Sequence, residues 1–321
     1  MELVTKKRFG LFTGRAHPAL AEEIADNLGV ALGETNLRSY PNGEIHCRYG
    51  ESIRGADVFI VQTHGGDNVN DSIMEQAIMI DAAKRASAKR ITAVCPYFGY
   101  SRQDRKAEGR EPITARFVAD LLTTAGAHRI VSVDLHSPQI QGFFDGPVDH
   151  LFGMPVIEEY LARETGADVT IVAPDAGRVK VAERLAQHLD ADLAMVYKKR
   201  ARGHVEARGV MGDIDGRHCV VIDDMIDTAG TICAAADILI DNGAASVWAM
   251  ATHGVLSDPA TDRLKNSSIS RVVVTNTLPI PPEKQHDKLE VLSVAPIIAD
   301  AIKAVFEDTS VSEIFGGENQ I

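Results

Sequence analysis

The sequence lacks the features that mark membrane, secreted and disulfide-rich proteins. No apolar run approaches the roughly 18 residues that a membrane-spanning helix needs, and no signal-peptide core follows the basic residues Lys6, Lys7 and Arg8. The four cysteines show neither CxxC nor CxxH spacing, which argues against a zinc site and against a redox pair. We therefore expect reduced thiols packed in strands and helices, no membrane partner and a cytoplasmic location.

Basic residues are also in the minority. The chain has 33 Lys and Arg residues against 45 Asp and Glu residues, which gives a formal net charge of -12. Nonspecific binding to nucleic acid draws on an extended basic surface that releases counterions. We therefore expect no nucleic-acid partner, and an anionic ligand must be held by a local cluster of donors.

Short apolar runs alternate with amphipathic segments along the whole chain. At 321 residues the chain exceeds the usual size of one hydrophobic core, so we expect two domains. The predicted strands are 9–13, 58–63, 91–95, 130–135, 169–173, 193–197, 219–223, 247–251 and 272–275, and the clearest helices are 113–125, 177–189 and 231–242. This alternation predicts an α/β fold in which each domain is a mostly parallel sheet flanked by helices.

A weak internal repeat indicates that the two halves are related. A shift of about 117 positions aligns Thr114 with Thr231 and Gly126 with Gly243. The junction falls near residues 152–155, where glycine and proline break the pattern. We predict an N-terminal domain at 1–152, a C-terminal domain at 153–300 and a tail at 301–321.

The strongest chemical signal is the segment 220–231, Val-Val-Ile-Asp-Asp-Met-Ile-Asp-Thr-Ala-Gly-Thr. It joins an apolar strand to two carboxylates, a turn of small residues and a helix. Backbone N–H groups at a helix N-terminus can converge on a phosphate, and the hydroxyls of Thr228 and Thr231 add donors. Asp223 and Asp224 are suitable acceptors for the 2- and 3-hydroxyls of a ribose. A plain acidic turn before a capped helix is the alternative, but two adjacent acids exceed what such a turn requires.

Three further clusters carry side chains suited to phosphate chemistry. Arg102 and Gln103 follow a predicted strand, where a guanidinium and an amide can hold a nucleotide. His136 and Asp175 fall at the carboxyl ends of two other predicted strands. The run 198–203, Lys-Lys-Arg-Ala-Arg-Gly, is interpreted as a mobile cationic loop that could stabilise transition-state charge, with a nucleic-acid or localisation patch as the alternative.

The segment 220–231 resembles the phosphoribosyl-diphosphate binding loop of the type I phosphoribosyltransferases and of the ribose-phosphate diphosphokinases, or PRPP synthetases. Four more segments match the diphosphokinase family, and transferases that act on nucleobases lack the last of them. These segments are 40–44 (Tyr-Pro-Asn-Gly-Glu), 98–105 (Phe-Gly-Tyr-Ser-Arg-Gln-Asp-Arg), 173–177 (Ala-Pro-Asp-Ala-Gly) and 133–145 (Val-Asp-Leu-His-Ser-Pro-Gln-Ile-Gln-Gly-Phe-Phe-Asp). Tyr40 stands where Phe is usual, and Arg178 stands where a small residue is common. The resemblance spans nearly the whole chain and implies two phosphoribosyltransferase-like domains.

The resemblance implies transfer of diphosphate from Mg·ATP to the 1-hydroxyl of ribose 5-phosphate, giving PRPP and AMP. It assigns the catalytic role to Lys198 and Arg200, and it makes His136 and Asp175 ligands of Mg²⁺. The implied ATP-binding residues are Tyr40, Asn42, Gly43, Glu44, Arg102 and Gln103. The implied ribose 5-phosphate-binding residues are Arg200, Asp223, Asp224, Asp227, Thr228, Ala229, Gly230 and Thr231.

The resemblance also implies a homo-oligomer, typically a hexamer, that phosphate activates and ADP inhibits at a site between subunits. The matching effector positions are Ser52, Arg54, Gln141, Ser310 and Ser312. Two other functions remain open: a noncatalytic regulatory subunit of the same fold, and a phosphoribosyltransferase that consumes PRPP. Retention of Lys198 and Arg200 together with both acids disfavours the first, and the nucleotide set with Arg102 and Gln103 disfavours the second.

Overall fold

The computed structural model describes residues 7–66, 68–165, 169–200 and 206–315, with the backbone alone for 198–200 and 206–208. The chain divides into two compact units. Unit 1 comprises Met1–Phe152, Thr277–Pro279 and Val294–Ile321, and unit 2 comprises Gly153–Asn276 and Ile280–Ser293. The predicted domains differ from these units chiefly at the C-terminal end, because the last helix clusters with unit 1. As limits of independently folding domains, they stay a prediction.

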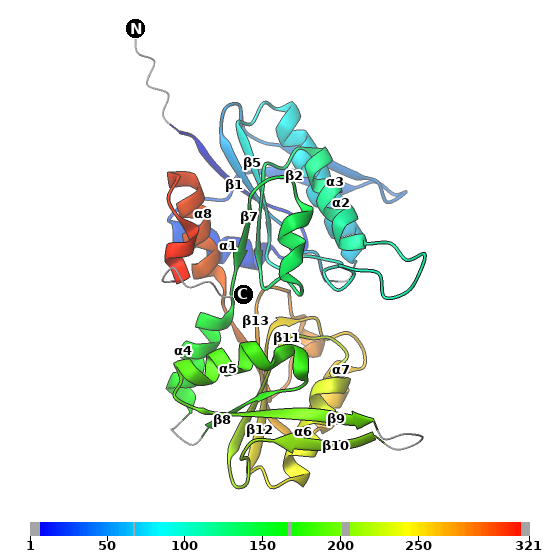
Figure 1. Ribbon diagram of the computed structural model, residues 1–321. Coiled ribbons are helices and arrows are strands. Elements are labelled where there is room, and N and C mark those ends of the chain that lie inside the picture. The colour runs from blue at the N-terminus through cyan, green and yellow to red at the C-terminus, as the bar shows by residue number, and fades with distance from the viewer. Residues whose placement is uncertain (1–6, 67, 166–168, 201–205, 316–321) are drawn as a thin grey trace. The chain divides into compact units, whose positions relative to one another are not determined.

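Unit 1 is built on a five-stranded parallel sheet. Its strands, in spatial order, are β1 (Phe9–Thr13), β4 (Asp57–Val61), β5 (Arg90–Cys95), β6 (Arg129–Val133) and β7 (Val148–Leu151). Helices α1 (Pro18–Leu28) and α8 (Ala295–Glu307) pack together on one side of the sheet, and α2 (Val69–Arg85) and α3 (Thr114–Ala125) pack together on the other (Figure 1). Burial on both faces explains why β4 is apolar almost throughout.

Helix α2 shows how local sequence fixes an element of unit 1. It begins after Asn68, whose side chain accepts hydrogen bonds from the N–H groups of Asn70 and Asp71. Ile73 and Ile80 recur at helical spacing and are buried against the sheet. A short antiparallel hairpin, β2 (Thr35–Ser39) and β3 (Ile45–Tyr49), lies against this helix.

Unit 2 is built on a seven-stranded sheet that is parallel except at one edge, where β10 pairs antiparallel with β9. Its strands, in spatial order, are β10 (Glu206–Met211), β9 (Asp192–Arg200), β8 (Val169–Ala173), β11 (His218–Ile226), β12 (Ser246–Gly254), β13 (Ile269–Thr275) and β14 (Leu289–Leu292). Its helices are α4 (Met154–Glu164), α5 (Val179–His188), α6 (Gly230–Asp241) and α7 (Ala260–Asn266).

The central strand β11 separates two hydrophobic cores within unit 2. Val220 and Ile222 pack with residues of α4 and α5, whereas Cys219 and Val221 pack with residues of α6 and α7. Successive strand residues face opposite sides of a sheet, so this continuous apolar run fills both cores. The buried run 219–222 therefore leads directly into Asp223 and Asp224, the two acids of the acidic segment 220–231.

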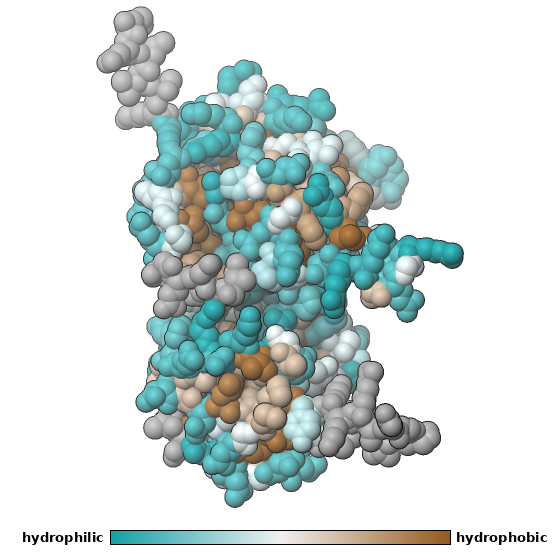
Figure 2. All heavy atoms as spheres, viewed as in Figure 1, coloured by the Kyte–Doolittle hydropathy of each residue, from teal (hydrophilic) through white to brown (hydrophobic). Residues whose placement is uncertain are grey.

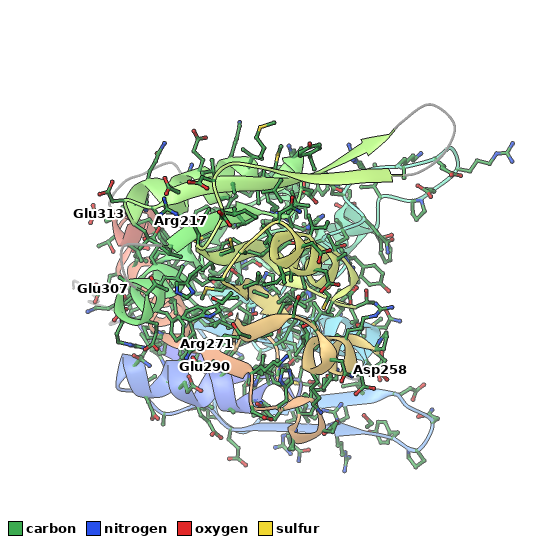
Figure 3. The ribbon with its side chains drawn as sticks, turned by 90° about the horizontal axis from the view of Figure 1, so that it is seen from below. Arg217, Asp258, Arg271, Glu290, Glu307 and Glu313 are labelled. Carbon is green, nitrogen blue, oxygen red and sulfur yellow. The ribbon has the colours of Figure 1, made fainter. Side chains whose placement is uncertain are left out.

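A polar cluster links the other edge of the sheet in unit 2. The Arg271 guanidinium lies 4.5 Å from the centre of the Trp248 ring, and its Nη1 is 3.1 Å from an oxygen of Glu164 and 3.9 Å from an oxygen of Glu290. Figure 3 shows Arg271 and Glu290 close together on neighbouring strands. These partly exposed contacts join β12, β13, β14 and α4.

All nine predicted strands overlap strands of the structure, and the three predicted helices correspond to α3, α5 and α6. The sequence analysis did not predict β2, β3, β7, β10 and β14, which are strands of four to six residues at the edge of a sheet or in a two-stranded hairpin. All four cysteines are free thiols in strands or a helix, as predicted. Among the described residues, no helix combines the length and the apolar character that crossing a bilayer requires.

Candidate active site

The acidic segment lies where β11 extends beyond the end of its neighbour β8. Strand β8 pairs with β11 only as far as Val221, whereas β12 pairs with β11 through Ile226. The strand therefore continues three residues beyond its predicted end at Asp223, because β12 supports it. As a result Asp223 and Asp224 stand at the carboxyl end of the sheet, beside the point where β8 turns away.

The loop after β11 presents backbone donors at the start of α6. Ala229 adopts the left-handed conformation, with φ 59° and ψ 7°, and α6 begins at Gly230. Arg263, on α7, donates from Nη1 to the carbonyl of Thr228 at 2.9 Å. The C=O and N–H of a peptide point in opposite directions, so this contact turns the Ala229 N–H away from Arg263. A loop of this kind at a helix N-terminus can hold a phosphate.

Arg178 joins the two acids. Its Nε lies 2.9 Å from Oδ1 of Asp223, and its Nη2 contacts Oδ1 of Asp224. The Asp224 N–H also donates to Oδ1 of Asp223 at 2.8 Å. Burial, followed by a hydrogen bond to Asp224 and repulsion from its charge, raises the pKa of Asp223 to about 7, although Arg178 acts in the opposite direction. The sequence analysis did not place Arg178 in the site, and its departure from the family pattern was the signal available.

Asp175 lies at the carboxyl end of β8, next to this cluster along the chain. It caps the short 3₁₀ helix Ala176–Arg178, and its Oδ1 accepts from the Gly177 N–H at 2.8 Å. The carboxylate is exposed, and a hard oxygen donor of this kind fits Mg²⁺, which keeps several waters and binds substrate phosphates. Within the described parts of the chain, no group of three His, Cys, Asp or Glu side chains is arranged to hold a metal ion by itself.

Arg102 and Gln103 lie in unit 1, in a turn fastened to the start of α3. The Gln103 N–H donates to the Tyr100 carbonyl at 2.8 Å, and the Gln103 carbonyl accepts from the Ala115 N–H at 3.2 Å. The Thr114 hydroxyl donates to the Gln103 side-chain oxygen at 2.6 Å. Both predicted ATP-binding side chains are exposed on this anchored turn.

His136 lies three residues beyond the end of β6, in a turn of unit 1. The strand ends at Val133, two residues earlier than predicted, because Asp134 adopts a positive φ of 38°. The Leu135 N–H donates to Nε2 of His150 at 2.9 Å, which holds the turn. His136 is half-buried, and its predicted role as a metal ligand stays a prediction.

The predicted residues Tyr40, Asn42, Gly43 and Glu44 form the exposed turn of the β2–β3 hairpin. The Tyr40 N–H donates to the Glu44 carbonyl at 2.8 Å, and the Glu44 N–H donates to Oδ1 of Asn42 at 3.2 Å. Gly43 has a φ of 90°, a conformation that favours glycine. The turn is therefore preformed and exposed at the end of unit 1's hairpin.

The sequence analysis predicted a loop at Lys198 and Arg200, and this prediction is wrong. Their backbone continues strand β9, where Lys198 pairs with Arg208 and Arg200 with Glu206 of β10. Residues 198–200 are all basic, so no apolar pattern indicated that the strand continues beyond Tyr197. Their side chains, and residues 201–203 of the same predicted loop, lie outside the described part of the chain.

The predicted effector positions all lie in unit 1. The Ser52 and Arg54 carbonyls accept hydrogen bonds from Arg8, and the hydroxyls of Ser310 and Ser312 are 2.7 Å apart. Gln141 donates to the Pro138 carbonyl at 3.1 Å. The predicted ATP-binding residues also belong to unit 1, whereas the ribose 5-phosphate residues and Asp175 belong to unit 2.

Comparison with known proteins identifies the family of the chain. Residues 9–126 match the N-terminal domain of ribose phosphate pyrophosphokinase, and residues 204–316 match the phosphoribosyl synthetase-associated domain. The ribose-phosphate pyrophosphokinase of Streptomyces avermitilis is 56% identical over 314 residues, covering 97% of each chain. That of Bifidobacterium longum is 57% identical over 316 residues, covering 96% of this chain and 93% of the relative.

A solved structure extends the likeness to three dimensions. The crystal structure of phosphoribosylpyrophosphate synthetase from Mycobacterium smegmatis matches with a TM-score of 0.89 and 52% identity, covering 94% of this chain and all of that one. Family, sequence and fold therefore agree over nearly the full length. The chain belongs to the ribose-phosphate pyrophosphokinase family.

Proposed function

We propose that the chain transfers a diphosphate group from Mg·ATP to the 1-hydroxyl of ribose 5-phosphate, giving PRPP and AMP. The observation that carries this proposal is the near-complete match, at more than half identity, to relatives named ribose-phosphate pyrophosphokinase. The geometry of the acidic segment and its loop is the local support.

The ribose 5-phosphate would bind at the carboxyl end of β11. In this proposal the loop formed by Asp227, Thr228, Ala229, Gly230 and Thr231 holds the 5-phosphate through backbone N–H groups and hydroxyls. The carboxylates of Asp223 and Asp224 accept hydrogen bonds from the ribose hydroxyls. The left-handed Ala229 and the contact between Arg263 and Thr228 support this role, because both fix the loop before a ligand arrives.

The nucleotide would bind through residues of unit 1. Arg102 and Gln103 are proposed to hold ATP, and the hairpin turn containing Tyr40, Asn42, Gly43 and Glu44 is proposed to reach the nucleotide of a neighbouring subunit. Support comes from the exposure of both turns and from the hydrogen bonds that fix them. Fixed donors cost little reorganisation when the ligand binds.

The reaction requires alignment and charge neutralisation more than covalent participation by the protein. Lys198 and Arg200 are proposed to stabilise charge that develops around the β-phosphorus. Asp175 and His136 would hold Mg²⁺, which supplies further charge neutralisation on the phosphate oxygens when bound. The exposed carboxylate of Asp175 suits this cation, whereas an imidazole is an unusual ligand for it.

We further propose a cytoplasmic homo-oligomer, a hexamer, with phosphate as activator and ADP as inhibitor. Figure 2 shows mostly hydrophilic side chains on the visible face, interrupted by apolar patches. Phe117 on α3 is 65% exposed and Met74 on α2 is 49% exposed, and these two helices pack together. These two exposed apolar side chains, on helices that pack together, are the support for association.

The test is AMP formation by the purified protein from ATP and Mg²⁺, with and without ribose 5-phosphate, in phosphate buffer. We expect AMP only when the sugar phosphate is present. A regulatory subunit would form none, and a PRPP-consuming transferase would release diphosphate from PRPP only when a base is added, without ATP. The comparisons give neither alternative any support.

A further inference from the structure

Arg178 occupies a position between two parts of unit 2 that the sequence keeps apart. It ends the short 3₁₀ helix after β8 and directly precedes α5. Strand β8 pairs with β11 only as far as Val221. The chain that follows β8 therefore lies beside the later residues of β11, which include Asp223 and Asp224. This topology brings the Arg178 side chain to the two acids, 45 and 46 positions further along the chain.

The three side chains form a largely buried ionic cluster. The side chains of Arg178, Asp223 and Asp224 are 20%, 21% and 8% exposed. Water screens charges poorly at this degree of burial, so each charge depends on its neighbours. Two carboxylates therefore share one guanidinium.

The planar guanidinium of Arg178 contacts both acids at once. Nε contacts Asp223 and Nη2 contacts Asp224, so separate N–H groups of one rigid plane hold separate carboxylates. Without a cation between them, two adjacent buried carboxylates repel each other and turn apart or take up a proton. Arg178 therefore helps to set the orientation of the acid pair, beside the hydrogen bond from the Asp224 N–H to Oδ1 of Asp223.

We propose that Arg178 is a positioning residue for sugar binding, which holds Asp223 and Asp224 in the orientation that accepts the hydroxyls of ribose 5-phosphate. This inference rests on the proposed function, since it takes the two acids as sugar ligands. Arg178 itself acts through the carboxylates. A small residue at this position leaves the acids without that support.

Three variants test the inference. Arg178→Ala removes both contacts, and Arg178→Lys keeps the charge but offers one flexible ammonium in place of a planar fork. Lys180→Ala is the matched control, because it removes one positive charge from an exposed side chain two residues further along, in α5. Thermal unfolding of each variant establishes that the fold is intact.

Two readouts are measured on the full chain. Calorimetry gives the Kd for ribose 5-phosphate in the absence of ATP, and steady-state assays give KM for each substrate separately. We expect Arg178→Ala to weaken ribose 5-phosphate binding by about tenfold or more, with KM for ATP changed by less than about twofold. Arg178→Lys should recover part of the loss, and Lys180→Ala should match the unchanged protein.

The outcomes separate this inference from the proposed function. Unchanged sugar affinity in a folded Arg178→Ala protein contradicts the inference, as does an equal rise in KM for both substrates. An unchanged protein that binds ribose 5-phosphate in an Arg178-dependent way but forms no AMP contradicts only the proposed reaction. An unchanged protein that does not bind ribose 5-phosphate contradicts both.

Discussion

Asp223 and Asp224 are adjacent, mostly buried and served by one guanidinium, so their charge state depends on their surroundings more than on their own chemistry. An aspartate carboxyl ordinarily has a pKa of 3.8, and burial together with the neighbouring acid raises the pKa of Asp223 to about 7. The folded chain thus holds a proton there more tightly than the unfolded chain does. Linkage then requires a pH-dependent contribution to stability.

This contribution is fully present below pH 4 and is lost as the pH rises through about 7. Asp223→Asn removes the titrating group while keeping its size. From pH 5 to pH 8 we expect the unfolding free energy of the unchanged protein to fall, relative to that of Asp223→Asn, by on the order of 1–3 kcal/mol. Urea unfolding of both proteins at the two pH values measures the difference, and parallel pH profiles would contradict the raised pKa.

Ala229 gives a second prediction at the residue scale. Its φ of 59° lies in the left-handed region, which costs an L-residue about 1–2 kcal/mol relative to glycine. We expect Ala229→Gly to keep or raise the unfolding free energy by up to about 1 kcal/mol, and Ala229→Val to lower it by about 1–3 kcal/mol, since a β-branched side chain tolerates this conformation poorly. Denaturant unfolding compares the three proteins. Equal stability of the valine variant would show that the loop does not depend on this conformation.

Residue types and their order predicted the acidic segment and its loop, because a strand, two acids and a small-residue turn form one continuous signal. They did not predict the partner of the acids. Arg178 reaches them through the pairing of β8 with β11, and no local pattern records which distant side chain such a pairing brings near.

At the scale of elements, a buried pair of polar side chains fixes the turn that leads to Arg102. The His64 ring is fully buried; its Nδ1 accepts from the Gly99 N–H at 3.2 Å, and its Nε2 lies 2.8 Å from Oε1 of Gln76. Since Nδ1 accepts, Nε2 carries the proton and donates to Gln76. Burial lowers the pKa of His64 to about 4, so the ring stays neutral between pH 5 and pH 9.

We predict that His64→Phe lowers the unfolding free energy by about 2–4 kcal/mol, because it leaves the Gly99 N–H and the Gln76 oxygen without these partners. KM for ATP should rise several-fold as the turn before Arg102 loosens, while the Kd for ribose 5-phosphate alone should not change. His218→Ala, which removes an exposed ring, serves as the control. An equal rise in KM for ATP and in Kd for ribose 5-phosphate, or no change in either, would show that His64 does not position the turn before Arg102.

Element prediction succeeded where burial imposes a pattern and failed where it does not. Strands such as β4 and β8, buried along their length, stand out as apolar runs. The β9–β10 hairpin is polar around Lys198, so the sequence reading ended the strand three residues early. Glycines at helix ends were more informative: Gly126 and Gly243, which the internal repeat aligns, follow α3 and α6 and have φ values of 121° and 101°.

At the scale of the whole molecule, composition and alternation predicted two α/β units, and the motifs predicted the family. The placement of α8 was not predictable from either. Its amphipathic pattern shows that it is covered on one face, but not by which unit. In the structure Phe306 lies 5.1 Å from Phe9, centre to centre, and Asp308 pairs with Lys7 and Arg90, so the end of the chain returns to unit 1.

We propose that the basic residues at the end of β9 catalyse diphosphate transfer, and the same strand supplies a control residue. Lys199 lies between Lys198 and Arg200 in β9 and carries the same charge, and the family resemblance assigns it no role. The most direct measurement is ribose 5-phosphate-dependent AMP formation from Mg·ATP by the unchanged protein, Lys198→Ala and Lys199→Ala. We predict a loss of about two orders of magnitude or more for Lys198→Ala and less than about fivefold for Lys199→Ala. Equal losses in the two variants, or AMP formation that does not need ribose 5-phosphate, would show that Lys198 is not a catalytic residue for diphosphate transfer to the sugar.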